Sequence, residues 1–363
     1  MKFIFKNYIL FKVSLIILLI NLAIILLSKN NKTLNFRENN IINKKKFLID
    51  VDVSHRIGKY GPNQFMKSIF EVLPYNTSDC NFIPYDNILP LNANNKSDFI
   101  LLPYPCFNES IYDDWTKSPY LKKLILGPLF VPGNWLYFPQ KKNWNERKFT
   151  EIMKSTKGIG VHSERVRAHI SQRSNTSYMI EKYIIIRACT NIKPKYIKPF
   201  KDRKIDILFF EKYADLDYTK FGEDLFQHFQ NSNIKIEKLK YGNYEKEDMK
   251  KLANDTKFII YFSFFDTGAI GLKEIQNFGV YAFTVQKDLA YDKKTSLYVP
   301  ELAELNIEKA YTIIMGKIQQ IIQLSPNSQV FAKINQENNK CEKAFEDVCN
   351  YLLKDVKKIN KYK

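Results

Sequence analysis

The second half of this 363-residue chain alternates short apolar runs with segments of helical periodicity, and this alternation constrains the fold more than any other feature. The predicted strands are 205–210, 234–241, 257–264 and 280–285, and the predicted helices between them are 219–230, 245–253 and 268–277. Short apolar strands joined by single helices are typical of a parallel sheet with helices on both faces. Residues 200–325 are therefore predicted to form a doubly wound domain.

The first half shows the same alternation with longer gaps. Its predicted strands are 47–54, 99–104, 123–131, 158–163 and 183–189, and its predicted helices are 62–73, 144–156 and 164–171. Residues 191–204 contain two prolines and many lysines, which is the composition of a linker. The predicted fold class is α/β, with two doubly wound, Rossmann-like domains at 47–195 and 200–325 and a C-terminal helical segment at 326–363.

A long apolar segment precedes these domains. Residues 8–27 contain only three polar side chains, and about 20 helical residues at about 1.5 Å each cross a bilayer core of about 30 Å. The residues that follow offer no convincing signal-peptide cleavage site. The sequence therefore predicts a transmembrane anchor at 1–28 and a polar stem at 29–46, while lysines on both sides leave the orientation of the anchor open.

Sequons and cysteines add two expectations. Six N-x-[ST] triplets begin at Asn31, Asn76, Asn95, Asn108, Asn175 and Asn254. They favour a glycoprotein whose globular part is lumenal, that is, a single-pass type II membrane protein of the Golgi or endoplasmic reticulum. The five cysteines show no C-x-x-C and no zinc spacing, so they predict no metal site, and their pairing stays open.

The net charge of +18 is compatible with nucleic acid, an anionic membrane surface or phosphorylated substrates. The lysines are scattered along the chain instead of forming one stripe with interleaved aromatic residues. None of the recognition motifs of nucleic-acid-binding proteins is present. We therefore expect no nucleic-acid partner.

One stretch, YFSFFDTGAIGLKEIQNFGVYAF, begins as a buried strand, breaks at Asp266 and Gly268, and continues as a helix that carries Glu274. Ligands of parallel sheets bind at the carboxyl ends of the strands, where loops lead into helix N-termini. We expect the glycines Gly268 and Gly271 to bring the backbone close to a ligand and the amides of 267–270 to hold a diphosphate. Glu274 would accept hydrogen bonds from the hydroxyl groups of a sugar.

The longer block LKYGNYEKEDMKKLANDTKFIIYFSFFDTGAIGLKEIQNFGVYAF resembles the donor-binding half of GT-B glycosyltransferases. It is most similar to the large retaining family with the E-x7-E motif, glycosyltransferase family 4 (group 1), which includes sucrose synthase and many bacterial mannosyl- and glucosyltransferases. That family has a glycine after the second strand of its C-terminal domain, then a strand that ends S-x-x-E, then a second Glu. The matching residues here are Gly242, Ser263, Asp266 and Glu274.

Two segments of the first half extend the resemblance over roughly 47–325. They are SHRIGKYGPNQFMKSIFEVLP, similar to the family's glycine-rich loop and first helix, and KGIGVHSERVRAHI, similar to its strand, serine and helix. The chain departs from the family at Asp266, which is one methylene shorter than the usual Glu. The basic pair that faces the diphosphate is not obvious, and Lys212 and Lys273 are its candidates.

The resemblance implies roles for individual residues. Asp266 and Glu274 would be the two acids of the catalytic site, with Glu274 on the ribose of a nucleotide sugar. The base would lie against Tyr241, Gly242 and Tyr244. The transferred sugar and the phosphates would lie against Ser263, Asp266, Thr267, Gly268, Ala269 and Ile270, with Gly58, Gly61 and Asn63 closing over them from the first domain.

The implied activity is transfer of a sugar from a nucleoside-diphosphate sugar to a hydroxyl group of a glycan, glycolipid or glycoprotein. The resemblance implies retention at the anomeric carbon, no metal and no cofactor. A phosphate oxygen of the donor can receive the proton of the acceptor hydroxyl. The expected partners are therefore the donor, the acceptor and the membrane bound through 8–27.

Two other classes of function stay open. A metal-dependent GT-A transferase uses a D-x-D at a strand end, and the two D-x-D pairs here are Asp50 with Asp52 and Asp215 with Asp217. A membrane-tethered protein that binds sugar or nucleotide without catalysis is the other class, because fold does not determine activity. Four aromatic residues could either pack in a core or contact substrate; they are His162, Trp115, Trp135 and Trp144.

Overall fold

The computed structural model describes residues 46–58, 61–86, 96–104, 117–129, 146–173, 181–212, 216–263, 266, 268–290 and 292–361. From Phe47 to Lys363 the chain forms one compact unit. The predicted anchor at 8–27 and the stem lie outside the described residues. Among the helices that are described, none combines the length and the apolar character needed to cross a bilayer.

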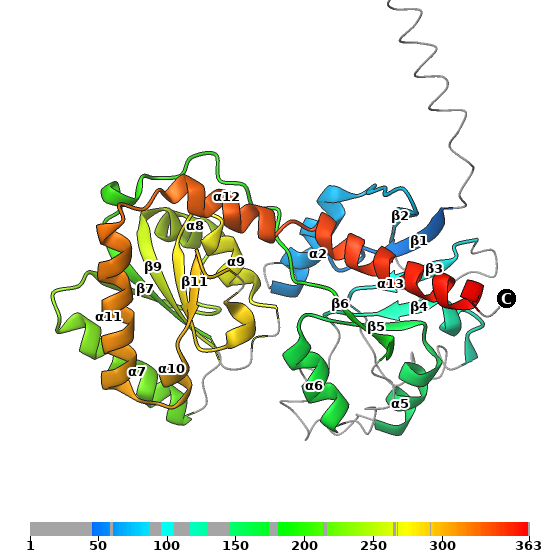
Figure 1. Cartoon of the computed structure of the whole chain (residues 1–363), viewed down its shortest axis with the longest axis horizontal. Helices are drawn as coiled ribbons and strands as arrows, with labels where there is room; N and C mark the ends of the chain where they lie inside the picture. Colours follow the sequence, from blue (N-terminus) through cyan, green and yellow to red (C-terminus); the bar gives the residue numbers. More distant parts are fainter. Residues whose placement is uncertain are drawn as a thin grey trace, which may run out of the picture. The chain divides into compact units, whose positions relative to one another are not determined.

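The first sheet has six strands, all parallel, in the order β2-β1-β3-β4-β5-β6 (Figure 1). The strands are β1 (Phe47–Asp52), β2 (Cys80–Tyr85), β3 (Phe99–Leu102), β4 (Leu124–Leu126), β5 (Gly158–Val161) and β6 (Tyr183–Ile185). One face packs against α2 (Gly61–Val72) through Phe65 and Ile69. The other face packs against α5 (Glu146–Ser155) and α6 (Glu164–Arg173).

The second sheet has five parallel strands in the order β11-β10-β9-β7-β8. They are β7 (Ile205–Glu211), β8 (Ile236–Lys240), β9 (Thr256–Phe262), β10 (Tyr281–Thr284) and β11 (Ser296–Tyr298). Alternate residues of β7 enter the cores on the two faces, so its central residues 207–210 are all apolar instead of alternating with polar residues.

Helices cover both faces of the second sheet (Figure 1). One face carries α7 (Leu216–Gln230), α10 (Pro300–Ala303) and α11 (Ile307–Gln323), and the other carries α8 (Lys246–Asp255) and α9 (Ile270–Gln276). Short 3-10 helices among the described residues are η1 (Leu121–Lys123), η3 (Phe200–Asp202) and η4 (Lys287–Leu289). The prediction of an α/β fold with two parallel, helix-covered sheets is confirmed.

Two edge strands and one inner strand differ from the predicted elements. Strand β2 was not predicted, because Asn81 and Pro84 interrupt the apolar pattern of its sequence CNFIPY. Strand β11 was also missed, since three residues give too short a pattern. The predicted strand at 123–131 is reduced to β4, because the chain turns at Gly127, whose φ is 93°.

The C-terminal segment returns to the first sheet after α12 (Ser328–Asn338). Helix α13 (Glu342–Lys361) buries Phe345 and Val348 in the same core as α2. Two disulfides join it and the residue just before it to the first sheet, Cys80–Cys349 and Cys189–Cys341, across 269 and 152 residues of sequence. Sequence spacing could not predict these pairs, because each links segments that only the fold brings together.

Candidate functional site

The strand order of the second sheet reverses between β7 and β9. The chain passes from β7 to β8 on one side and then returns to β9 on the other side of β7. In open α/β sheets, ligands bind at the carboxyl ends of the two strands that flank such a reversal. We call the residues that follow these two ends, Lys212 after β7 and Ser263 to Ala269 after β9, the switch-point edge.

Asp266 occupies the switch-point edge with both carboxylate oxygens bonded, and its side chain is 8% exposed. Oδ2 accepts hydrogen bonds from Lys212 Nζ at 2.6 Å and from the Tyr261 hydroxyl. Oδ1 accepts the backbone N–H groups of Gly268 at 3.2 Å and Ala269 at 2.9 Å. Burial raises the pKa of Asp266, but the charge of Lys212 and these hydrogen bonds outweigh burial and lower the pKa to about 2.

The loop amides that were expected to hold a diphosphate are therefore already engaged. Those of Gly268 and Ala269 donate to the carboxylate of Asp266 two and three residues earlier, a local bond that Asp side chains commonly make in turns. Thr267 lies outside the described residues. The expectation that the amides of 267–270 are free is wrong for these two groups.

The two glycines of this loop differ in how closely neighbouring residues approach them. The residue in the left-handed conformation is Ala269, with φ 47° and ψ 42°. A Cβ atom on Gly268 would lie 3.1 Å from His162 Nε2 and 3.2 Å from Ala188 Cβ, so Gly268 permits a close approach of residues from the first sheet. A Cβ on Gly271 would make only an ordinary contact of 3.5 Å with a phenylalanine ring.

Glu274 lies on α9 and is 5% exposed. Lys246, at the start of α8, places Nζ 3.1 Å from Oε1 of Glu274. Burial raises the pKa of Glu274, and the charge of Lys246 opposes that rise without cancelling it. Lys246 also donates to Gln64 Oε1 of α2, and Gln64 Nε2 donates to the Gly58 carbonyl at 2.5 Å. A chain of polar contacts thus connects Glu274 with the loop after β1.

Lys273, a candidate for contact with the diphosphate, is buried on α9. Its side chain is 1% exposed, and Nζ donates to the Ala188 carbonyl at 2.6 Å. Burial lowers the pKa of Lys273 to about 7, with a contribution from the charge of Arg187 and an opposing one from Asp266. This lysine therefore joins α9 to the chain that follows β6.

The loop after β1 is held together by Asn63. Nδ2 of Asn63 donates to the carbonyls of His55 at 3.0 Å and Ile57 at 3.1 Å. Gly58 has φ 140°, and a Cβ there would lie 2.8 Å from the Asn63 side chain. Gly61 begins α2, and a Cβ on it would come no closer than 3.9 Å to a neighbouring side chain, so this glycine is not required by close packing.

The residues expected to border a nucleotide base lie beyond β8. Lys212 Nζ is 4.5 Å from the centre of the Tyr241 ring. Gly242 has φ 88°, and nothing described lies within 4 Å of where its Cβ would be. The Tyr244 ring lies 5.9 Å from that of Phe210. The structure therefore brings Lys212 and Tyr241 together beside open space at Gly242.

His162 follows β5, and its ring is buried beside Gly268. Nδ1 lies 3.0 Å from the Ile186 carbonyl, so Nδ1 carries the proton and Nε2 is an acceptor. Nε2 has no hydrogen-bond partner among the described residues, and the same is true of Ser263 Oγ. Burial lowers the pKa of His162 to about 4. The ring is therefore neutral at physiological pH.

Sequence reasoning missed a second contact between the two sheets. Arg165, at the start of α6, donates through Nε to Asp288 Oδ2 at 3.1 Å and through an Nη atom to the Asp266 carbonyl at 3.1 Å. Ser163 Oγ donates to Asp288 Oδ2 at 2.7 Å. The only signal in the sequence was the run of polar residues directly after strand β5, which contains both Ser163 and Arg165.

The D-x-D alternative gains no support from the described residues. Asp50 and Asp52 are both 6% exposed within β1, and Asp52 Oδ1 accepts the Ser54 N–H at 3.0 Å. Asp217 lies in α7, and Asp215 lies outside the described residues. In the part of the chain that the structure describes, no group of three or more His, Cys, Asp or Glu side chains could hold a metal. Trp115, Trp135 and Trp144 lie outside that part.

No protein-family model and no curated protein matches this chain. The chain is similar in structure to the lipopolysaccharide outer core galactosyltransferase WaaB in its apo form, with TM-score 0.49, 10% identity, and coverage of 85% of this chain and 99% of that one. It is also similar to sucrose-phosphate synthase from Thermosynechococcus elongatus, with TM-score 0.47, 9% identity, and coverage of 88% and 100%. The transcription regulator CcpA of Lactococcus lactis matches with TM-score 0.22, 14% identity, and coverage of 76% and 92%. We draw nothing about function from likenesses at these scores.

Proposed function

We propose that this chain is a membrane-anchored glycosyltransferase that moves a sugar from a nucleoside-diphosphate sugar to an acceptor hydroxyl, with retention and without a metal. The acceptor would be a glycan, a glycolipid or a glycoprotein. The observation that carries the proposal is the pairing of two buried carboxylates with two lysines beside the strand reversal of the second sheet, Asp266 with Lys212 and Glu274 with Lys246.

The two lysines suit different parts of a nucleotide sugar. The ammonium group of Lys212 lies at the switch-point edge, 2.6 Å from Asp266 Oδ2, where its positive charge would attract a phosphate group. Tyr241 beside it offers an aromatic face for a base, with open space at Gly242. Glu274 has one lysine partner, which leaves lone pairs that can accept hydrogen bonds from ribose hydroxyls.

The chemical step would rest on electrostatic stabilisation of the leaving group. The diphosphate gains negative charge as the bond to the sugar breaks, and Lys212 is held in place by Asp266 before that charge develops. Asp266 itself would orient Lys212 and the loop that faces the sugar. A phosphate oxygen of the donor would take the proton from the acceptor hydroxyl, so no further general base is needed.

The compartment is part of the same proposal. Two disulfides favour an oxidising environment, and Asn76, which begins a sequon, is exposed. We infer a type II orientation with residues 47–363 in the lumen of the Golgi or endoplasmic reticulum and residues 8–27 in the bilayer. Carbonate washing should leave the full-length chain in the membrane, and glycosidase treatment should shift its mobility. Extraction by carbonate would contradict the anchor.

The direct test of donor binding is a thermal-shift screen of the full-length chain in detergent, with and without a chelator. A nucleoside diphosphate or its sugar that binds only the folded state raises the melting temperature by mass action. We expect one nucleotide to stand out and the chelator to have no effect. Absence of a shift with every nucleotide, or a shift that the chelator abolishes, would overturn the proposal as stated.

A second candidate function is a membrane-tethered protein that binds a nucleotide sugar without transferring it. The observation that favours it is that four donors already surround Asp266, so this carboxylate has little capacity to contact a sugar. Both candidates bind the donor, but only the transferase breaks the sugar–phosphate bond. Slow hydrolysis of the cognate donor by the purified chain would distinguish the transferase from the binding protein.

A further inference from the structure

A cavity of about 730 Å³ lies between the linker that follows β6 and the outer side of α8. Its walls include Lys195 and Tyr196 of the linker and Lys250 of α8, and Phe278 contributes apolar surface. The volume is within the range of about 300–1,000 Å³ that small-molecule sites occupy. None of the site residues described above contributes to it.

This cavity lies at the opposite end of the second sheet from the switch-point edge. Asp255, which lines the cavity, immediately precedes β9, whereas Asp266 follows the carboxyl end of that strand. Strand β9 has seven residues, and at about 3.3 Å per residue it separates the two places by roughly 20 Å. The cavity wall also includes Lys250 and Glu247, the residue after Lys246, and the charge of Lys250 acts on Glu274, so the cavity is distant from Asp266 but not from Glu274.

The linker wall of the cavity is fixed at both ends by hydrogen bonds. Asn277 Nδ2 donates to the Ile192 carbonyl at 2.9 Å. At the other end, Lys198 donates its N–H to Asn254 Oδ1 at 2.9 Å, and its carbonyl accepts a hydrogen bond from Arg203 Nε at 3.1 Å. The residues between these bonds are therefore presented on a preorganised loop, and binding would need little ordering of the backbone.

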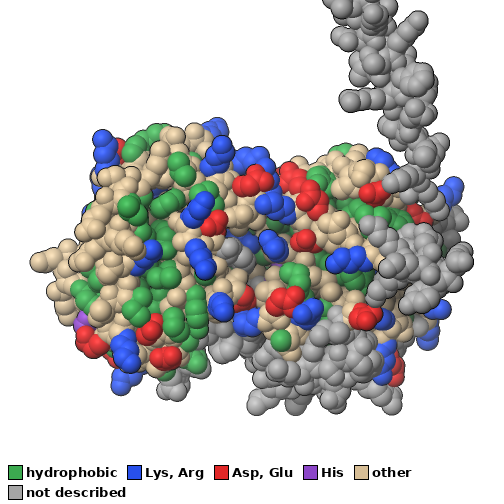
Figure 2. All heavy atoms as spheres, viewed as in Figure 1, with side chains coloured by type: hydrophobic (Ala, Val, Ile, Leu, Met, Phe, Trp, Pro, Cys, Tyr) green, Lys and Arg blue, Asp and Glu red, His purple; other side chains and the backbone are tan. Residues whose placement is uncertain are grey.

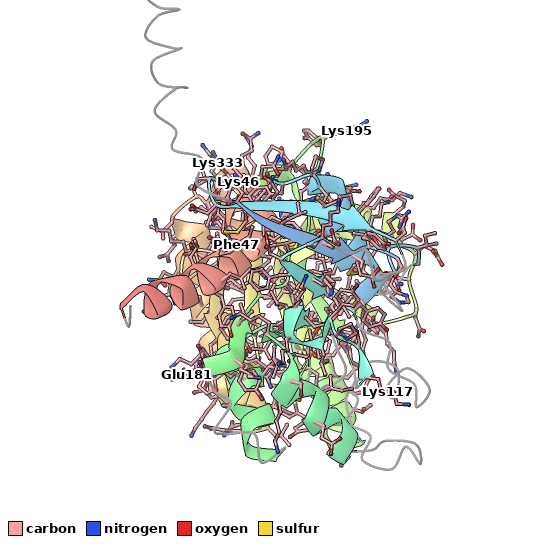
Figure 3. All side chains as sticks on the ribbon, turned by 90° about the vertical axis from the view of Figure 1, so that its right-hand side faces the viewer. Lys46, Phe47, Lys117, Glu181, Lys195 and Lys333 are labelled. Atoms are coloured by element: carbon pink, nitrogen blue, oxygen red, sulfur yellow. A yellow bond between two sulfur atoms is a disulfide. The ribbon has the colours of Figure 1, made fainter. Side chains whose placement is uncertain are left out.

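The charges that face this cavity are of two kinds. Lys198 and Lys250 are neutralised by Asp255 at 2.5 Å and Glu247 at 2.6 Å. Lys193 and Lys195 are exposed, and no ion pair or hydrogen bond of either side chain is made to another described residue. Figure 3 shows Lys195 at the outer edge of the molecule, with its side chain directed away from the ribbon.

We propose that this cavity is a second binding site, for a carbohydrate that carries sulfate, phosphate or carboxylate groups. Lys193 and Lys195 would bind the anionic groups. Tyr196, which is 64% exposed, offers an aromatic face on which a sugar ring can pack. The oxygens of Glu247 and Asp255 would accept hydrogen bonds from sugar hydroxyls while staying paired with their lysines.

The same features disfavour a nucleic acid and a bilayer as the occupant. Of the two aromatic side chains in the walls, Phe278 is buried and only Tyr196 is exposed, and one exposed ring cannot stack successive bases. A membrane surface needs a broad basic patch instead of a cavity. On the face shown in Figure 2, lysines and arginines lie among acidic side chains and form no such patch.

The test uses the full-length chain in detergent and isothermal titration calorimetry at low salt with a heparin hexasaccharide. Maltohexaose is the neutral comparison, and inorganic sulfate tests the anion alone. The diagnostic variant is Lys193→Gln/Lys195→Gln. Its matched control is Lys201→Gln/Lys220→Gln, which removes the same charge from exposed lysines that do not line the cavity.

We expect the hexasaccharide to bind and maltohexaose to bind far more weakly. Lys193→Gln/Lys195→Gln should weaken binding roughly tenfold, because each exposed ion pair contributes modestly and is screened by salt. The control should change affinity less than twofold. Tyr196→Ala should weaken binding of the hexasaccharide and leave any binding of inorganic sulfate unchanged.

Four outcomes would overturn the proposal. They are no binding of the hexasaccharide, an equal loss in the diagnostic and control variants, sulfate that binds as tightly as the hexasaccharide, and stronger competition from a short DNA or from anionic lipid vesicles. The diagnostic variant should keep its nucleotide-dependent thermal shift, since Lys193 and Lys195 are exposed and make no ion pair or hydrogen bond with the described residues of the proposed nucleotide site. Failure of the transferase proposal would thus appear in the nucleotide screen and not in this titration.

Discussion

Asp266 and Glu274 are two carboxylates from one short stretch of chain, and both are buried, yet their surroundings differ. Asp266 receives four hydrogen bonds, two of them from backbone N–H groups, and its pKa is lowered to about 2. Glu274 has one lysine partner at 3.1 Å, and its pKa is raised. Burial alone acts in the same direction on both, so the number of donors decides the sign of the shift.

This difference separates a carboxylate that supports the fold from one that is available to a ligand. Asp266 holds Lys212 and closes the turn after β9, so it has little capacity left for further hydrogen bonds. Glu274 is under-satisfied, and hydrogen bonds from a ligand would compensate for its burial. The sequence motif treats the two acids as equivalent members of a pair. In the structure, Asp266 supports the fold and Glu274 is available to a ligand, and variants of each residue test this difference.

Asp266→Asn should have the largest effect, and it should act on stability. The change leaves Lys212, which is 14% exposed, without its carboxylate, and breaking such a buried pair costs about 3 kcal/mol. Urea unfolding at neutral pH measures the change. Lys212→Met and the double variant complete a thermodynamic cycle, in which the double variant should recover part of the loss. A loss below about 1 kcal/mol would show that the four hydrogen bonds of Asp266 do not support the fold.

The stability that the parent protein loses in acid should depend on the same carboxylate, that of Asp266. The folded pKa of Asp266 is about 2 and the ordinary value is 3.8, so its contribution is present above pH 4 and lost as the pH falls toward 2. The loss should be about 2 kcal/mol. Unfolding curves of the parent and of Asp266→Asn between pH 5 and pH 2 measure it. If the two proteins lose stability in parallel over this window, Asp266 is not the group responsible.

Much of this architecture was predictable because buried parallel strands are apolar throughout. The runs around β7 and β9 stood out, and the fold rule then placed Lys212 and the residues after β9 at one edge. Local chemistry was harder to predict. Nothing in the sequence distinguishes an aspartate that accepts hydrogen bonds from its own loop amides from one that faces solvent, so the environment of Asp266 could not be predicted.

Long-range contacts were not predictable from spacing. Arg165 and Asp288 are 123 residues apart, and Cys80 and Cys349 are 269 residues apart. Each of these pairs depends on where the chain returns in space. Lys273 shows the same limit, since a lysine one residue before Glu274 could face either the donor or the first sheet. In the structure, Lys273 Nζ donates a hydrogen bond to the Ala188 carbonyl in the chain that follows β6.

Glu274→Gln should act on ligand binding and leave the fold intact. The amide keeps the shape but removes the charge that strengthens hydrogen bonds from ribose, so nucleotide affinity should fall roughly ten- to a hundredfold. Stability should change by less than about 0.5 kcal/mol, since the buried charge is itself unfavourable. Calorimetric titration with the nucleotide found in the thermal-shift screen measures the first effect, and urea unfolding measures the second.

Glu211→Gln is the matched control for Glu274→Gln. Glu211 is equally buried, at 5%, and also has a lysine Nζ at 3.1 Å, but its partner is Lys238. Glu211→Gln should leave the affinity for the nucleotide unchanged. Equal affinity of Glu274→Gln and the parent for the nucleotide, or unfolding of the ligand-free variant, would make Glu274 a structural charge like Asp266, and the contrast between the two acids would disappear.

Gln64→Ala should have the smallest effect on nucleotide affinity, and it tests whether a residue of α2 influences Glu274 through Lys246. Gln64 accepts a hydrogen bond from Lys246 and so keeps part of that ammonium group away from Glu274. Without Gln64, Lys246 can bind Glu274 more fully and compete with ribose hydroxyls. One hydrogen bond of about 1 kcal/mol, partly compensated, corresponds to roughly threefold weaker nucleotide binding.

Gln336→Ala removes a comparable side-chain hydrogen bond on α12 and should leave nucleotide affinity unchanged. A loss of tenfold or more would mean that Gln64 contacts the nucleotide itself, and an unchanged affinity would mean that Lys246 does not limit access to Glu274.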